Sequence, residues 1–160
     1  MDDEKLFVRG LQEGFGGGAS RKGIRRGPFK LESSRYETEK GDVYHDEWMA
    51  GRVGGGQELI EVGGKRFTRV YAGGTISEKS LESLGLTKKD VIGFLKKQIL
   101  DNGDKIRLHT GFEPEAEEDW RYEYKIIDNE EGIPVTTGKE SIFYKEELVF
   151  VHVFVLSPIE

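Results

Sequence analysis

The sequence of 160 residues contains no cysteine. This absence excludes disulfide bonds, thiolate zinc sites, iron–sulfur clusters and a cysteine nucleophile. Proteins of the reducing cytosol also rarely carry disulfides. The composition therefore agrees with a cytoplasmic location, which is the location that we expect.

Long apolar runs are absent as well. The longest, Leu148–Leu156, is interrupted by His152, and it is far shorter than the roughly 20 apolar residues that span a bilayer as a helix. Residues 1–5 carry three acidic side chains and lead into no apolar stretch, so we expect no signal peptide. The formal net charge of −6 argues against general binding to nucleic acids or anionic membranes.

The residues that are present are typical of a globular domain. Hydrophobic residues make up 36% of the chain, charged residues 34% and aromatic residues 11%, whereas disordered chains are poor in aromatic residues. A chain of this length suits one domain and can bury a core without a disulfide or a metal ion. We therefore expect a single domain over residues 1–160.

The spacing of apolar residues predicts three helices. The first begins at residue 2 or 3 and ends before the glycine-rich stretch 14–28, which is expected to be a loop. The second is a short helix over residues 77–84. The third begins after Thr87, in a pattern that resembles a capping box, and ends near Asp101.

Seven runs have the composition of strands. They cover approximately residues 29–38, 42–49, 56–62, 65–72, 120–127, 139–144 and 148–156. Gly63 and Gly64 are expected to form a two-residue hairpin turn, because both accept positive φ. Lys145 and Glu146 are expected to form the turn between the last two strands.

The two halves of the chain resemble each other. The matches are Phe7-Val8-Arg9 with Phe94-Leu95-Lys96, Arg35-Tyr36-Glu37 with Arg121-Tyr122-Glu123, and residues 56–60 with residues 138–142. We interpret residues 1–75 and 85–160 as an internal pseudo-repeat, and chance similarity between two sheets is the alternative. The predicted fold class is α+β: a curved, mainly antiparallel sheet of about seven strands from two helix-plus-meander units, with two main helices packed on one face.

Four short stretches resemble an uncharacterised domain-of-unknown-function family. They are Asp42-Val43-Tyr44-His45-Asp46-Glu47-Trp48, Gly55-Gly56-Gln57-Glu58, Tyr71-Ala72-Gly73 and Phe94-Leu95-Lys96. Members of that family occur as small stand-alone proteins and as the C-terminal part of some helix-turn-helix transcriptional regulators. The resemblance implies a role in sensing a ligand or binding a partner. It supplies no catalytic residues.

Two glutamates hold matching positions in the predicted hairpins. The Gly63-Gly64 turn places Glu58 directly opposite Arg69, and a cross-strand pair of opposite charge explains both residues structurally. The second turn places Glu140 opposite Val151, among apolar residues. Burial without a cation would raise the pKa of this carboxyl group, so Glu140 is a candidate acid, base or ligand contact.

We therefore expect a non-enzymatic domain that binds a small molecule or a partner protein, in a cavity on the open face of the sheet. The predicted ligand-binding residues are Tyr44, Trp48, Glu58, Arg69, Tyr71 and Glu140. Aromatic side chains combined with a few polar groups are typical of small-ligand pockets. Self-association into a homo-oligomer through an exposed sheet edge is a further option.

A basic segment supports an alternative function. The candidate anion-binding residues are Arg21, Lys22, Arg25 and Arg26, which follow the glycine loop 14–19. Backbone amides in such a loop, together with these cations, could bind phosphate or a nucleic acid. The other interpretation is a basic loop that contacts the acidic stretch 113–119.

A third function would be an enzyme that uses a buried carboxylate, or His45, as acid or base. His45 and Glu47 share one face of a strand and could supply two metal ligands, but no third ligand is evident. His152 lies in an apolar strand and is expected to be a hydrogen-bonded core histidine. We therefore assign no catalytic residue, no metal ion and no cofactor from the sequence.

Overall fold

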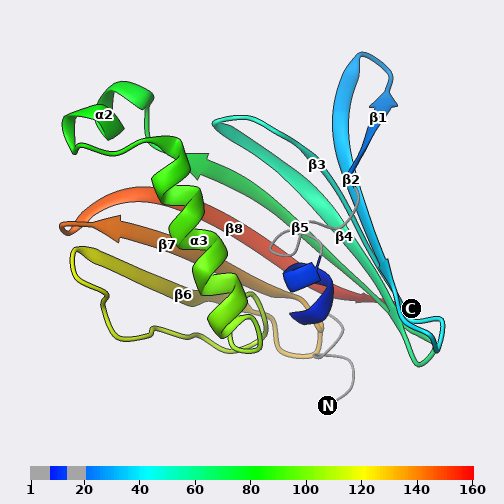
Figure 1. Ribbon diagram of the computed structural model, residues 1–160. Helices are drawn as coiled ribbons and strands as arrows, with labels where there is room; N and C mark the ends of the chain where they lie inside the picture. Colours follow the sequence, from blue (N-terminus) through cyan, green and yellow to red (C-terminus); the bar gives the residue numbers. More distant parts are fainter. Residues whose placement is uncertain (1–7, 14–20) are drawn as a thin grey trace.

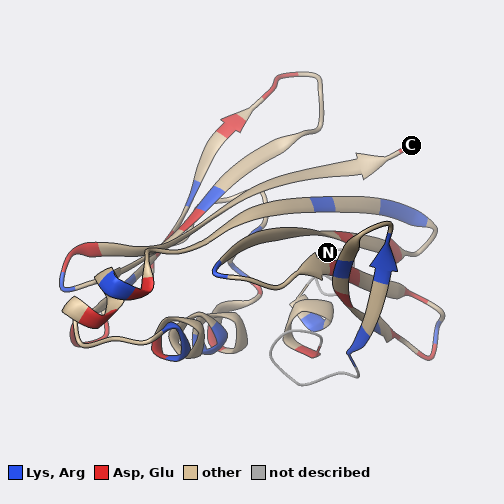
Figure 2. Ribbon diagram, turned by 90° about the horizontal axis from the view of Figure 1, so that it is seen from above, with Lys and Arg blue, Asp and Glu red and all other residues tan. Residues whose placement is uncertain are grey.

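The computed structural model describes residues 8–13 and 21–160. These residues form one antiparallel sheet of eight strands, with the helices on one of its two faces (Figures 1 and 2). The strands are β1 (Lys22–Arg26), β2 (Phe29–Glu37), β3 (Val43–Met49), β4 (Val53–Val62), β5 (Lys65–Thr75), β6 (Trp120–Asn129), β7 (Thr136–Tyr144) and β8 (Glu147–Ile159). The helices are α2 (Glu78–Ser83) and α3 (Lys88–Asn102), and residues 8–13 form a further short helical segment.

The strand order is β1-β2-β3-β4-β5-β8-β7-β6, so two meanders meet where β5 pairs with β8. Tyr71 pairs with Phe154 at the middle of this junction. The strand partners of Glu58 and Glu140 each lie two residues before this central pair. The two glutamates therefore occupy matching places on either side of an approximate two-fold axis. The origin of the halves as an internal repeat stays a prediction, as does the single domain.

The predicted fold class is wrong, because strands dominate the structure. Two main helices were expected, but among the described residues only α3 is long, with 15 residues, whereas α2 has 6. The sheet has eight strands rather than about seven, because part of the predicted loop 14–28 forms β1. The sequence of β1, Lys-Gly-Ile-Arg-Arg, contains a single apolar side chain. Its strand conformation comes from pairing with β2 across the turn at Gly27 and Pro28, which apolar periodicity does not indicate.

Residues 1–7 and 14–20 lie outside the described residues. They include the first half of the predicted first helix and the glycine-rich part of the predicted basic loop.

The core lies between α3 and the inner face of the sheet, which we define as the face that carries the helices. Val91, Leu95 and Ile99 of α3 are buried against Tyr122 and Phe154 of the sheet. Burial of such apolar side chains is the main favourable contribution to folding. The capping box at Thr87 is confirmed, and it satisfies backbone groups at the start of α3.

Both predicted hairpin turns are confirmed. Gly63 and Gly64 have φ values of 55° and 78° and connect β4 to β5. Lys145 and Glu146 adopt φ values of 47° and 63° between β7 and β8, although neither is glycine. Positive φ at both central residues is the geometry of a type I′ hairpin turn.

The opposite face of the sheet, here called the outer face, carries none of the described helices (Figure 2). Its middle bears the exposed side chains of Leu59, Val70, Val153 and Val155. Val70 and Val155 are direct partners across β5 and β8. None of the described helices is long and apolar enough to cross a membrane.

Candidate functional site

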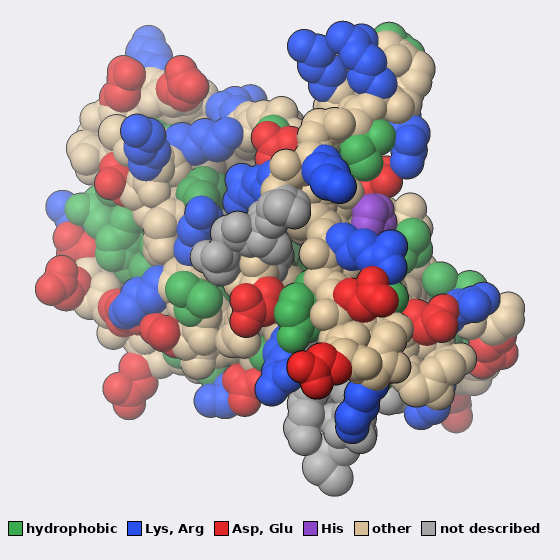
Figure 3. Space-filling view, turned by 45° about the vertical axis from the view of Figure 1, so that its right-hand side comes forward, with side chains coloured by type: hydrophobic (Ala, Val, Ile, Leu, Met, Phe, Trp, Pro, Cys, Tyr) green, Lys and Arg blue, Asp and Glu red, His purple; other side chains and the backbone are tan. Residues whose placement is uncertain are grey.

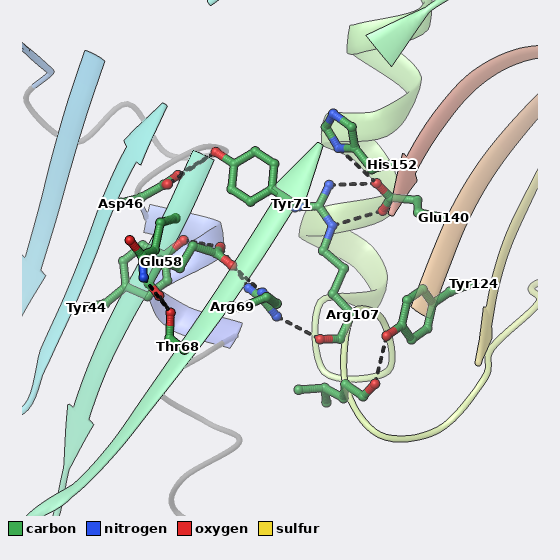
Figure 4. Close-up of polar contacts among 12 residues, drawn as sticks. Tyr44, Asp46, Glu58, Thr68, Arg69, Tyr71, Arg107, Tyr124, Glu140 and His152 are labelled. Carbon is green, nitrogen blue, oxygen red and sulfur yellow. Dashed lines mark hydrogen bonds and ion pairs between the residues drawn. The ribbon is translucent and has the colours of Figure 1, made fainter. Parts of the chain in front are cut away.

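Five of the six predicted ligand-binding residues come together on the inner face (Figure 4). Tyr44, Glu58, Arg69 and Glu140 are joined by hydrogen bonds through Arg107. Tyr71 lies beside them and is bonded to Asp46, and we call the whole group the inner network. Strand alternation places them on the same face as the core.

Trp48, the sixth predicted residue, lies near the end of β3, on the inner face by alternation. The guanidinium carbon of Arg21 stands 5.6 Å from the centroid of its ring. Within the described part of the chain, no hydrogen bond joins Trp48 to the network.

The carboxylate of Glu58 is fully enclosed by partners from neighbouring strands. Arg69 on β5 donates to both of its oxygens, and the Nη2–Oε1 distance is 2.8 Å. The hydroxyl of Tyr44 on β3 donates to Oε1 at 2.5 Å. Burial alone would raise the pKa of Glu58, but the charge and hydrogen bonds of Arg69 outweigh burial and lower it. Glu58 is therefore a buried carboxylate, and its predicted cross-strand pairing with Arg69 is confirmed.

Glu140 has an equivalent environment with a different source of charge. Arg107, in the segment between α3 and β6, donates through Nε and Nη2 to the two carboxylate oxygens at 3.0 and 2.8 Å. The hydroxyl of Tyr122 donates to Oε1 at 2.7 Å. Burial opposes ionisation, but the charge of Arg107 prevails and lowers the pKa of Glu140 to about 2.

The expectation that Glu140 lacks a cation and has a raised pKa is therefore wrong. Its predicted partner, Val151, is also wrong, because a register shift between Ile142 and Phe143 places Glu140 opposite His152. A bulge of this kind moves every pairing beyond it by one residue.

Arg107 joins the two carboxylate clusters. Its side chain binds Glu140, and its carbonyl oxygen accepts a hydrogen bond from Nη1 of Arg69 at 2.8 Å. The backbone of Arg107 has φ of 59°, a conformation that costs energy for a side chain other than glycine. The surrounding contacts hold the residue in this conformation, as is common where a backbone position has a specific task.

Asp46 is the acidic group of the network that has no arginine against it. The Tyr71 hydroxyl lies 3.2 and 3.3 Å from its two carboxyl oxygens, and Asp46 pairs across the strands with Glu58. Burial, followed by repulsion from Glu58, raises the pKa of Asp46 to about 8. Asp46 therefore holds a proton at neutral pH, next to an ionised glutamate.

His152 and Thr75 lie at the margin of the network. Nδ1 of His152 lies 3.7 Å from Oε2 of Glu140, beyond hydrogen-bonding distance. Among the described residues, this nitrogen and the hydroxyl of Thr75 are buried without a hydrogen-bond partner. The His152 ring lies among aromatic side chains, tilted against Tyr71 with ring centroids 5.5 Å apart. In the described part of the chain, the expected hydrogen bond of this histidine is not found at Nδ1.

These contacts fill the space in which a ligand cavity was expected. Tyr44, Glu58 and Arg69 are each 1% exposed, and Glu140 is 0% exposed. Their polar atoms bind one another, so the network stabilises the junction of the two meanders. Binding of a ligand by these residues stays a prediction.

A groove of about 560 Å³ lies instead on the outer face of the sheet, over β1 to β5. Its lining residues are Arg26, Phe29, Leu31, His45, Glu47, Met49, Gly55, Gly56, Gln57, Leu59 and Val70. Five of them are large apolar side chains. Phe29, Met49, Leu59 and Val70 are exposed, with between 40% and 57% of their surface accessible.

The polar end of the groove consists of Arg26, His45 and Glu47. Oε1 of Glu47 lies 3.0 Å from Nη2 of Arg26 and 3.1 Å from Nε2 of His45. The Arg26 contact crosses β2, so it ties β1 to β3 over the groove. His45 and Glu47 share a face, as predicted. In the described part of the chain, no group of three or more histidine, aspartate or glutamate side chains is arranged to hold a metal ion.

The candidate anion-binding residues all lie in or next to β1. Arg21 lies 3.7 Å from Glu32, and Arg26 pairs with Glu47. Lys22 and Arg25 are exposed and form no ion pair with the described residues. The structure thus gathers these cations on one hairpin, where two of them already contact carboxylates.

The alternative interpretation, in which the basic segment contacts the acidic stretch 113–119, is wrong for the described basic residues 21–30. The acidic stretch lies beside β6, where Glu117 binds Lys97 and Gln98, and Glu113 contacts Arg121. β1 and β6 are the opposite edges of the sheet. The two charged segments are therefore separated by the full width of the sheet.

The sequence analysis missed two parts of this arrangement. Arg107 was missed because it lies in an irregular segment between α3 and β6. A buried Glu140 needs a cation, and this need was the signal that could have pointed to Arg107. The groove was missed because its wall depends on β1. The signal for it was the apolar side chains, such as Leu59 and Val70, at positions that alternate with the core-facing ones.

Comparisons with models of protein families, with curated proteins and with solved structures find no match to this chain.

Proposed function

We propose that this chain is a cytoplasmic, non-enzymatic binding domain, and that its ligand is a small molecule with an apolar body held in the outer groove. The observation that carries this proposal is the groove itself, with a volume of about 560 Å³. Pockets for small molecules typically have volumes of roughly 300 to 1,000 Å³, with apolar walls and a few polar groups.

The composition of the groove supports this class of ligand. Phe29, Leu31 and Leu59 offer apolar contact, and the exposed apolar surface that they leave in water favours a bound hydrophobic group. The polar end at His45 and Glu47 provides hydrogen-bonding atoms that would orient the ligand. The inner network supports the groove indirectly, since it holds β3, β4 and β5 in a fixed register.

The inner network itself is a weaker candidate for the ligand site. Each of its two ionised carboxylates already accepts hydrogen bonds from an arginine and a tyrosine. A ligand would have to replace these contacts inside a low-dielectric interior, where an unpaired charge is costly.

The groove can be tested with 2-naphthalenemethanol, a neutral probe with an apolar body and one hydroxyl group. We expect it to shift the amide resonances of residues 55–59 and 70 in a saturable manner. The Val70→Gln variant should weaken binding at least about fivefold, because a polar side chain replaces part of the apolar wall.

The matched control is Val155→Gln. Val155 pairs with Val70 across β5 and β8 and has a similar exposure, 39% against 45%, but it does not line the groove. It should bind the probe as the native chain does. Equal weakening in both variants, or amide shifts confined to the inner face, would contradict a ligand site in the groove.

A further inference from the structure

The two edges of the sheet differ in how they are covered. The edge of β6 that faces away from β7 forms isolated bridges, in which Phe112 pairs with Tyr124 and Glu117 with Trp120. β1 pairs with β2 alone among the described segments. Alternate N–H and C=O groups of an edge strand point away from its partner, so β1 presents backbone donors and acceptors that another strand can pair with.

The uncovered edge is strongly basic. Lys22, Arg25 and Lys30 are exposed and form no ion pair with any described residue, and the side chain of Arg26 is 61% exposed although it contacts Glu47. Figure 3 shows Lys and Arg side chains gathered at the tip of the β1–β2 hairpin. This concentration of positive charge contrasts with the net charge of −6 of the whole chain.

We propose that β1 is a docking strand for an extended acidic segment of a partner protein, which adds to the sheet beside β1. The ladder of backbone hydrogen bonds would supply affinity, and the cations would select acidic side chains. Lys22 and Arg26 alternate with Arg25 along β1, so the strand presents cations on both faces. An acidic side chain of the docked segment would therefore lie near a cation on either face of the sheet.

A strand fits this edge better than a nucleic acid does. The phosphate backbone can pair with the cations, but it cannot complete a β-ladder with alternating donors and acceptors. Aromatic side chains on which bases stack are also scarce at this edge: Phe29 is the aromatic residue of the β1–β2 turn region, and it faces the groove. The edge shares Arg26 with the groove, but Lys22, Arg25 and Lys30 do not line the groove. Variants of Lys22 and Lys30 therefore test the edge alone, and either proposal can fail while the other holds.

The experiment uses the full chain and three peptides of seven residues. The first alternates glutamate and valine, the second has the same sequence with alternate backbone amides methylated, and the third replaces each glutamate with lysine. We expect the first peptide to bind, with an affinity that falls as ionic strength rises from about 0.02 M to about 0.3 M. Methylation removes donors from the ladder and should weaken binding at least about tenfold, and the lysine peptide should not bind.

Two double variants test the site on the protein. Lys22→Glu with Lys30→Glu should weaken binding of the acidic peptide at least about tenfold, because attraction becomes repulsion. Lys79→Glu with Lys89→Glu is the matched control. It makes the same change in net charge at exposed lysines of α2 and α3 and should bind the peptide nearly as the native chain does.

Three outcomes would overturn the proposal. The first is no binding of the acidic peptide at low salt. The second is equal binding of the methylated peptide, which would mean attraction of charges without strand pairing. The third is a single-stranded oligonucleotide that binds the hairpin and is not displaced by the peptide, which would identify a nucleic-acid surface. The comparison of peptides uses the native chain, so it decides the question even if a variant fails to fold.

Discussion

Glu58 and Glu140 are buried carboxylates at matching positions of the two meanders, and each is held by one tyrosine and one arginine. The tyrosines are equivalent: Tyr44 and Tyr122 each come from the strand next to the glutamate. The arginines are not, because Arg69 lies directly opposite Glu58, whereas Arg107 reaches Glu140 from outside the sheet. The same electrostatic requirement is thus met once by strand pairing and once by a loop.

Replacing Arg107 with methionine should strongly destabilise the fold. The change leaves Glu140 buried without a cation, and breaking a buried ion pair typically costs about 3 to 5 kcal/mol. Urea unfolding at neutral pH measures the effect. Arg66→Met is the control, since the Arg66–Glu61 pair is exposed on the surface and such pairs contribute about 0 to 1 kcal/mol.

The same variant should also change the response to acid. In the native chain, the pKa of Glu140 is lowered to about 2, so its contribution to stability is present above the ordinary pKa and is lost as pH falls toward 2. Without Arg107, burial raises the pKa of this carboxyl. The difference in free energy of unfolding between native chain and variant should therefore shrink as pH falls, and a constant difference would argue against the ion pair.

The two tyrosine hydroxyls provide a matched pair of smaller changes. Tyr44→Phe and Tyr122→Phe each remove one donor to an ionised carboxylate. Hydrogen bonds to charged groups contribute about 1.5 to 3 kcal/mol, so both variants should lose stability by similar amounts. A loss confined to one of them, measured by urea unfolding, would show that the two clusters are not energetically equivalent.

Asp46→Asn should remove a pH dependence from the native chain. The pKa of Asp46 is raised to about 8 in the fold, above its value in an unfolded chain, so the folded state binds this proton more tightly. Its contribution is fully present below about pH 4 and is lost as pH rises toward about 8. The free energy of unfolding of the asparagine variant should therefore fall less than that of the native chain between about pH 4 and about pH 8.

The readout for Asp46 is the slope of unfolding free energy against pH, compared with the exposed control Asp128→Asn. Burial and then repulsion from Glu58 raise the pKa of Asp46, and the hydrogen bond from Tyr71 opposes this shift. If both asparagine variants keep the same slope as the native chain, Asp46 does not hold its proton at neutral pH.

Two glycines in strands should differ sharply in how well the fold tolerates their replacement by alanine. A Cβ at Gly56 would lie 2.5 Å from the carbonyl oxygen of Glu47 and 2.6 Å from the hydroxyl of Tyr71, whereas a Cβ at Gly23 meets nothing within 4 Å. Gly56→Ala should therefore cost about 1 to 3 kcal/mol through overpacking. Gly23→Ala should leave the melting temperature unchanged or slightly raised, and thermal unfolding of the two variants makes the comparison.

Local sequence rules predicted the hairpins well. The turn at Gly63 and Gly64 determined the register of β4 and β5, so the pairing of Glu58 with Arg69 followed from counting residues. Tyr122 and Tyr124 alternate with charged residues along β6, and both tyrosines face the core. These features depend on neighbours in sequence, which explains why they could be predicted.

The remainder depends on contacts between distant segments. The register shift near Ile142 changed the partner of Glu140, and nothing in the local pattern marks it. Arg107 neutralises a residue 33 positions away, and β1 exists because β2 pairs with it. The position of the groove follows from β1, so the sequence indicated exposed apolar residues but not the surface that they form.

Arg107 also has a consequence for how the chain assembles. Its carbonyl receives Arg69 from the first meander and its side chain neutralises Glu140 in the second, while the neighbouring Leu108 packs with Tyr44 and Ile60. A fragment that stops at the end of β5 would lack the carbonyl oxygen of Arg107, which accepts a hydrogen bond from Nη1 of Arg69. It would also lack the side chain of Leu108, which packs with Tyr44 and Ile60. Denaturation should therefore be all-or-none, with both meanders lost in one step rather than peeling apart in sequence.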